Sequence, residues 1–206
     1  MRLIIGITLP AGIGLILLGE PILEFFRWGS FSAEDVAQTA PLVAIYGFGL
    51  PFYSAATFVT RGLHACKDMK SPVRIAGVCL LVNFFGSITL MQFLGVQGLA
   101  ISNVLAAMVQ AVCLWRALVN HHRELSIVRM RSACFKILGA GMIMGVFCVF
   151  SDQLLQSYNL EGKRYALATI GFVIPLCVVL YVGLLYLLKF EELKLLLGRV
   201  KEKVNR

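Results

Sequence analysis

Charged residues are scarce in this sequence. Asp, Glu, Lys and Arg make up 15% of its 206 residues, whereas hydrophobic residues make up 59% and the mean hydropathy is +0.83. A soluble domain carries about 25% charged residues and could not bury so much apolar surface in so short a chain. The composition therefore excludes an ordinary soluble domain and predicts an all-α, polytopic transmembrane helix bundle.

The sequence also lacks the motifs of metal sites and common enzymes. Its six cysteines never form a C-x-x-C pair, and its three histidines (His64, His121 and His122) lie in no H-E-x-x-H or Ser/His/Asp pattern. Two adjacent histidines cannot both point from one face of a helix. We predict no catalytic site, no metal and no cofactor, and we expect the cysteines to be free thiols within apolar segments.

No Asp, Glu, Lys or Arg lies deep in an apolar segment. This absence argues against a self-contained proton- or sodium-coupled site, which uses intramembrane ionisable groups. The net charge of +8 does not indicate nucleic-acid binding either, because that reading requires a basic face on a soluble domain. We predict that the chain binds no nucleic acid.

Six apolar segments are long enough to cross a membrane, and no second domain is visible. The first segment lacks a small-residue cleavage site and leads into further spans, so it is not a signal peptide. The transmembrane bundle covers residues 1–190, and the predicted spans are residues 3–18, 36–65, 73–94, 99–118, 133–150 and 165–188. The motif Ser32-Ala33-Glu34-Asp35 has the form of a capping box and predicts that the second helix starts there.

The basic residues predict the orientation of the bundle. With six spans, both termini and the second and fourth links lie on the same side. Sixteen basic residues fall on that side: Arg2, Arg61, Lys67, Lys70, Arg74, Arg116, Arg123, Arg129, Arg131, Lys136, Lys189, Lys194, Arg199, Lys201, Lys203 and Arg206. Only Arg27, Lys163 and Arg164 fall on the other. Because Lys and Arg favour cytoplasmic links, we predict that both termini are cytoplasmic.

Two basic segments follow from this orientation. The turn around residues 61–76 is predicted to be a cytoplasmic anchor, with Pro72 in the first turn of the next helix. Residues 191–206 form a basic amphipathic tail, which either lies along the anionic inner leaflet or remains solvated.

A few polar and helix-bending residues lie inside the spans. Asn83, Asn103 and Gln110 either hydrogen-bond across helices or line a pathway, and Asn103 and Gln110 share a helix face because they are seven residues apart. Pro10 and Pro51, with Gly47 and Gly49, are candidate hinges, although static kinks are the alternative. Small residues at four-residue spacing indicate close helix packing.

Residues 9–55, "LPAGIGLILLGEPILEFFRWGSFSAEDVAQTAPLVAIYGFGLPFYSA", are followed by "RGLHACKDMKSPVRIA" and later by "LGVQGLAISNVLAA". The pattern includes Leu9-Pro10, Glu20-Pro21-Ile22 as the exit from the first helix, and Lys70-Ser71-Pro72-Val73. Together these motifs resemble the second half of the MurJ/MviN lipid II flippases, which belong to the multidrug/oligosaccharidyl-lipid/polysaccharide exporter superfamily. Residues 3–120 carry the resemblance, and only hydropathy extends it further.

The resemblance implies six of fourteen helices in a two-lobed inner-membrane transporter that works by alternating access. The cargo would be a lipid-linked peptidoglycan precursor, and spans 133–150 and 165–188 would form a groove for its lipid tail. Arg61 and Arg74 would stand at the cytoplasmic mouth.

The sequence departs from the family at Leu63-His64 and Thr57, and the cations that hold the pyrophosphate in the family lie mainly outside this region. We therefore expect that this chain alone does not flip lipid II and that it works with a further lobe or a partner chain. The alternatives are a related exporter of drugs or of polysaccharide and oligosaccharide lipids, and a membrane fragment that transports nothing.

Overall fold

The computed structural model describes residues 2–27, 31–121, 127–157 and 162–188, and the described part consists of helices joined by short turns, with no strand. Six of its helical segments are long and apolar enough to cross a membrane by length and composition. The elements are α1 (Arg2–Phe25), α2 (Ala33–Ala65), α3 (Lys70–Leu94), α4 (Val96–His121), α5 (Ile127–Ser157), α6 (Gly162–Ala168), the π-helical turn η1 (Thr169–Val173) and α7 (Ile174–Leu187). The predicted all-α membrane bundle is confirmed.

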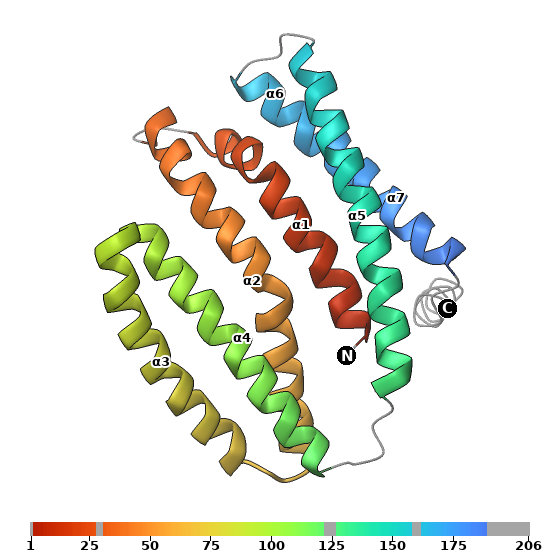
Figure 1. The fold of residues 1–206 in the computed structure, drawn as a ribbon. Coiled ribbons are helices and arrows are strands. Elements are labelled where there is room, and N and C mark those ends of the chain that lie inside the picture. The colour runs from red at the N-terminus through yellow and green to blue at the C-terminus, as the bar shows by residue number, and fades with distance from the viewer. Residues whose placement is uncertain (1, 28–30, 122–126, 158–161, 189–206) are drawn as a thin grey trace, which may run out of the picture.

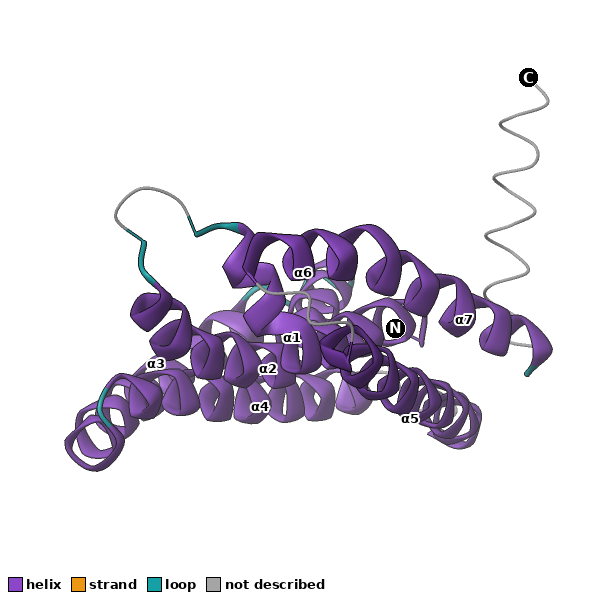
Figure 2. Cartoon of the chain, turned by 90° about the horizontal axis from the view of Figure 1, so that it is seen from above, coloured by secondary structure: helices purple, strands orange, loops and turns teal. Residues whose placement is uncertain are grey.

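The helices form a curved array in which α3, α4, α2, α1 and α5 follow one another in space, an order that differs from their order in the chain (Figure 1). Helix α2 packs against α1 on one side and α4 on the other, while α3 packs against α4 at the outer edge. On its far side α1 contacts α5, and the continuous run of α6, η1 and α7 packs on α1 and α5. Seen from above, the array is a shallow arc rather than a closed ring (Figure 2).

Two apolar clusters hold the array together. Buried side chains of α2 and α4 form one cluster, which includes Val59, Leu63 and Leu114. The other joins α1, α5 and α7 around residues such as Ile137 and Tyr181. The array therefore has two packing centres, and α1 connects them by contacting both α2 and α5.

Glycines allow the closest helix contacts. A methyl group on Gly12 of α1 would strike the carbonyl oxygen of Gly47 on α2, and one on Gly47 would lie 2.9 Å from the carbonyl oxygen of Gly12. Similarly, a methyl group on Gly98 of α4 would strike the backbone of Leu90 on α3. Helices associate in lipid through such close packing, because the lipid tails are as apolar as the helices and the hydrophobic effect does not drive the helices together.

The capping box predicted at the start of α2 is present. The Ser32 hydroxyl accepts a hydrogen bond from the Asp35 backbone N–H at 3.2 Å, and the Ser32 N–H donates to the Asp35 carboxylate at 2.8 Å. Two of the donors that a helix start leaves unpaired are thereby satisfied. At the other end of α2, Asp68 accepts from the N–H groups of Lys70 and Ser71 and fixes the turn into α3.

Several helices extend beyond the predicted spans. Helix α1 continues through Pro21 to Phe25, so the expected exit at Glu20-Pro21 is wrong. A proline removes only its own N–H, and Pro21 is buried within a helix that packs on its neighbours on either side. The links predicted at 119–132 and 151–164 are also shorter, because α4, α5 and α6 continue into polar residues that hydropathy does not detect. The predicted tail at 191–206 lies outside the described residues.

Candidate functional site

A row of polar side chains runs along one face of α2. Tyr46, Tyr53 and Thr57 follow one another at spacings of seven and four residues, so a rotation of 100° per residue stacks them. This face differs from the one that meets α1, where Gly47 lies, and from the one that meets α4, where Val59 and Leu63 lie. The row therefore lies on a face of α2 that is turned neither toward α1 nor toward α4.

Helix α4 carries a matching row. Asn103 and Gln110 share a face, as predicted, and that face lies about 100° around the helix from Val104 and Ala111, which pack on α2. The buried Leu114 follows Gln110 at a spacing of four residues and ends the row. Helices α2 and α4 run in the same direction (Figure 1), and Val104 lies against Gly49. Helical geometry then places the rows of α2 and α4 on the same side of the pair and at interleaved heights.

The polar face is unusual because its groups lack partners. In the described part of the chain, Asn103 and Gln110 are half-buried and make no side-chain hydrogen bond, and the buried Tyr53 hydroxyl has none either. Thr57 bonds only to the carbonyl of Tyr53 in its own helix. An unpaired polar group facing hydrocarbon costs several kcal/mol. The arrangement therefore suits water or a polar ligand, not lipid tails.

Arg61 extends this face toward the end of α2. A cavity of about 280 Å³ lies between α1 and α2, and it is lined by Ile4, Tyr53, Ser54, Thr57, Phe58 and Arg61. The Arg61 side chain is exposed and has no carboxylate partner in the described residues. The cavity thus combines hydroxyl groups with one unneutralised cation, a combination that suits an anionic or hydroxyl-rich ligand.

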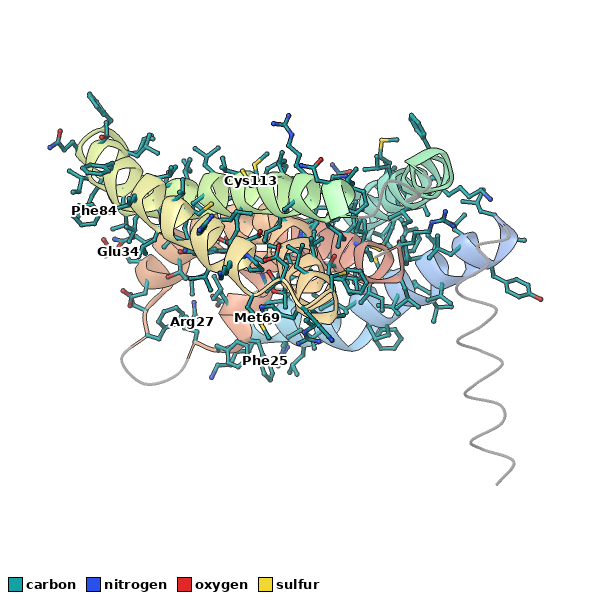
Figure 3. All side chains as sticks on the ribbon, turned by 90° about the horizontal axis from the view of Figure 1, so that it is seen from below. Phe25, Arg27, Glu34, Met69, Phe84 and Cys113 are labelled. Carbon is teal, nitrogen blue, oxygen red and sulfur yellow. The ribbon has the colours of Figure 1, made fainter. Side chains whose placement is uncertain are left out.

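Arg74 lies on the first turns of α3 and is also exposed. The link between α2 and α3 places Arg61 and Arg74 at the same end of the bundle, near Lys67 and Lys70 (Figure 1). Figure 3 shows Met69 in this turn, and its side chain is 58% exposed. The structure brings the two arginines to one end but shows no direct contact between them.

Asn83 is placed differently from Asn103 and Gln110. The Ser102 hydroxyl on α4 is 3.0 Å from the Asn83 carbonyl oxygen and 3.1 Å from its side-chain Oδ1, and Ser87 donates to the same Oδ1 at 3.2 Å. Gly86 makes room, because a methyl group there would lie 2.6 Å from the Ser102 Oγ. Asn83 therefore bonds across α3 and α4, as the helix-bonding alternative describes.

Pro10 lies in the middle of α1 and leaves a backbone acceptor unpaired. It has no N–H to bond the carbonyl four residues earlier, which belongs to Gly6. The Tyr181 hydroxyl of α7 donates to that Gly6 oxygen at 2.8 Å. A tertiary hydrogen bond thus takes the place of the missing helical one.

The other hinge candidates, Gly47, Gly49 and Pro51, are packed closely. Gly47 touches the backbone of α1, and Pro51 lies beside Gly12. A methyl group on Gly49 would lie 2.7 Å from the Tyr53 ring and 2.8 Å from Val104. Close packing explains both glycines, and a hinge role remains a prediction.

An apolar cavity of about 450 Å³ lies between α1, α5 and α7. Its wall includes Pro10, Gly14, Met144, Cys148, Cys177 and Tyr181. The two spans that the resemblance associates with a lipid tail supply part of this wall, and α1 supplies the rest. Its wall is almost wholly hydrocarbon, which suits an acyl or isoprenoid chain and no charged group.

Three features escaped sequence reasoning. They are the unpaired hydroxyl of Tyr53, the hydrogen bond of Tyr181 and the contact of Cys148 with Cys177. Each depends on tertiary neighbours that sequence spacing does not reveal. A lone tyrosine in an apolar helix does signal a hydroxyl in need of a partner, so Tyr181 could have been found. In the part of the chain that the structure describes, no group of three or more His, Cys, Asp or Glu side chains could hold a metal ion.

Comparison with known proteins places this geometry in a family. The sequence matches the family model described as "Lipid II flippase MurJ" over residues 1–196. It is 32% identical over 191 residues to a probable lipid II flippase MurJ of Bdellovibrio bacteriovorus, covering 89% of this chain and 35% of that protein. It is 31% identical to a Thermotoga maritima relative with the same description, covering 94% of this chain and 37% of the relative.

A solved structure supports the fold. "Lipid II flippase MurJ, inward closed conformation" superposes with a TM-score of 0.73 at 23% sequence identity, covering 91% of this chain and 37% of that one. The chain therefore spans little more than a third of the length of the relatives that it matches.

Proposed function

Since the chain belongs to the lipid II flippase MurJ family, we propose that it forms part of a machine that moves a lipid-linked peptidoglycan precursor across the bacterial inner membrane by alternating access. The cargo of such a machine has a polar headgroup and a long apolar tail. Both kinds of surface are present here: the polar face of α2 and α4, and the apolar cavity of α1, α5 and α7.

The unpartnered polar face is the observation that carries this proposal. The part of α2 from Tyr46 to Thr57 is about 16 Å long at 1.5 Å per residue, roughly half of a hydrocarbon core. Tyrosine rings, amides and hydroxyls are well suited to sugar hydroxyls, because they offer donors, acceptors and flat apolar surfaces. We assign the headgroup side of the path to this face, including Asn103 and Gln110.

The apolar cavity would take the tail. Its 450 Å³ accommodates only a few isoprenoid-sized units, so the rest of a long tail would stay in the bilayer. Arg61 and Arg74 would meet phosphate at the cytoplasmic mouth, if both termini lie in the cytoplasm as the distribution of basic residues predicts. Asn83 is the weakest path candidate, since its side chain already bonds to Ser102.

Cysteine accessibility tests the polar face. In a background in which the native cysteines are replaced, we expect Asn103→Cys and Gln110→Cys to react with a membrane-impermeant thiol reagent in permeabilised cells. Val112→Cys, on another face of α4 and also exposed in the bundle, is the matched control and should stay unlabelled. Protection of all three positions would show that the face is covered by lipid or by another helix.

We further propose that this chain does not transport lipid II unaided. A diphosphate needs compensating cations at low dielectric, and the membrane-depth residues described here offer only Arg61 near one end. Expression of the 206-residue chain in flippase-depleted cells is therefore expected to leave them inviable. Growth of those cells would overturn this part of the proposal.

A further inference from the structure

Two buried thiols meet between α5 and α7. The Sγ atoms of Cys148 and Cys177 are 2.9 Å apart, and the residues are 1% and 3% exposed. They come from helices separated by 29 positions in the sequence, and both belong to the apolar cluster that joins α1, α5 and α7. Both residues line the cavity proposed for the lipid tail, but the transport proposal gives their thiol groups no chemical role.

We propose that Cys148 and Cys177 are an oxidative modification site, a dithiol that a small uncharged peroxide converts into an intramolecular disulfide. A disulfide has an S–S length of about 2.05 Å, so the two sulfur atoms need to approach by less than about 1 Å. The helices that carry them are already packed together. Bond formation therefore needs no unfolding and no change in helix register.

The cavity gives the oxidant access. Both thiols line the 450 Å³ apolar cavity, although water hardly reaches them. An uncharged peroxide can enter such a space, whereas a charged thiol reagent would have to shed its hydration shell at a high cost. The site should therefore distinguish oxidants by charge.

The chemistry balances with one peroxide. The sulfur of one cysteine attacks the O–O bond, which breaks to give a sulfenic acid and, with the proton that the thiol loses, one water molecule. The second sulfur then attacks the sulfenic sulfur, its proton leaves with the hydroxyl group as a second water, and the S–S bond forms. Two thiols are oxidised by two electrons and the peroxide is reduced to two waters.

The cross-link would join two walls of the cavity at mid-helix and fix α5 against α7. This inference does not depend on the proposed transport function, because it rests only on the position and accessibility of the two sulfur atoms.

Counting thiols tests the proposal. The chain in native membranes is treated with hydrogen peroxide, quenched, unfolded in SDS and alkylated with a maleimide, and the intact mass is measured. The six cysteines of the sequence should give six labels before treatment and four afterwards. Peptide mapping should join Cys148 to Cys177. A permanently charged thiol reagent applied to the native protein should leave these two unmodified.

Single variants decide the outcome. Cys148→Ser and Cys177→Ser should each keep five labels with or without peroxide. The double variant Cys177→Ser/Val173→Cys, which moves the thiol by about one helical turn from α7 to the end of η1, should keep all six. Six labels in the treated wild type, a disulfide between other cysteines, or loss of two labels in Cys148→Ser would each overturn the proposal.

Discussion

At the scale of single residues, the Tyr181 hydroxyl replaces a backbone donor that α1 lacks at Pro10. A buried carbonyl without a donor is costly, and in a membrane there is no water to satisfy it. The bond from Tyr181 to Gly6 lets α1 contain a proline without that cost, and it ties α7 to the point where α1 is weakest. If α1 bends at Pro10 during transport, this hydrogen bond would transmit the movement to α7.

This pairing predicts a coupled effect on stability. We expect Tyr181→Phe to lower the free energy of unfolding by about 0.6–2 kcal/mol, because the Gly6 carbonyl loses its donor. In a Pro10→Ala background the same change should cost less, since the alanine restores the helical N–H to that carbonyl. Unfolding in mixed detergent measures both values. Equal losses in the two backgrounds would contradict the assignment.

The sequence did not predict which of the intramembrane asparagines makes a hydrogen bond to another helix. Asn83 and Asn103 both lie in apolar helices, and nothing in the spacing separates a bonded amide from an unbonded one. The difference arises from Ser102, which reaches Asn83 because Gly86 lets the two helices approach. Tertiary contacts between α3 and α4 therefore decide a question that the local sequence left open.

A stability comparison checks this difference. Asn83→Ala should reduce the free energy of unfolding by about 1 kcal/mol, because Ser102 and Ser87 lose a shared acceptor. Asn103→Ala, which removes no hydrogen bond within the described chain, should change it by less than about 0.5 kcal/mol. The two variants are matched in residue type and differ in contacts. Similar losses in both would mean that Asn103 has a partner.

At the scale of elements, hydropathy predicted the number and order of the spanning helices but only some of their ends. The apolar run of a helix gives the part that lies in lipid, whereas α5 begins at Ile127 and ends at Ser157, well beyond its apolar stretch. The start of α2 was found because Ser32 and Asp35 form a cap with a specific local pattern. The predicted ends at residues 65 and 94 also coincide with the ends of α2 and α3. The π-helical turn η1 just before Pro175 had no recognised signal.

The contact between α1 and α2 depends on two facing glycines, Gly12 and Gly47. Gly12→Ala places a methyl group against the Gly47 carbonyl oxygen, a backbone atom that cannot move aside, so the helices must separate. We expect destabilisation of about 1–3 kcal/mol. Gly14→Ala on the same helix meets nothing within 4 Å and should be neutral or slightly stabilising, since alanine favours helix. Thermal unfolding in detergent separates the two, and equal effects would refute the close contact.

At the scale of the whole molecule, charge is divided between the two ends of the bundle. Arg61, Lys67, Lys70 and Arg74 lie where α2 leads into α3, whereas Glu20, Glu34 and Asp35 belong to the end of α1 and the start of α2, which lie at the opposite end of the bundle (Figure 1). Figure 3 labels Glu34 together with Arg27, which pairs with Glu24 at 2.7 Å. In the part of the chain that the structure describes, the four cations have no carboxylate partner. Both a membrane anchor and a mouth that attracts phosphate require such cations, so Arg61 and Arg74 fit either role.

Neutral substitution separates the two roles. In the assembled transporter we expect Arg61→Gln/Arg74→Gln to slow lipid II transport about a hundredfold to ten-thousandfold, because the two charge-assisted bonds to phosphate contribute about 1.5–3 kcal/mol each. Membrane insertion and topology should not change, since the many other basic residues on the same side still orient the chain. A matched variant, Lys67→Gln/Lys70→Gln, removes the same charge from the same turn but lies outside the cavity that Arg61 lines, and it should transport normally. Reduced insertion or an inverted topology in the arginine variant would assign Arg61 and Arg74 to anchoring, and equal slowing in both variants would mean that total charge matters and the position of Arg61 does not.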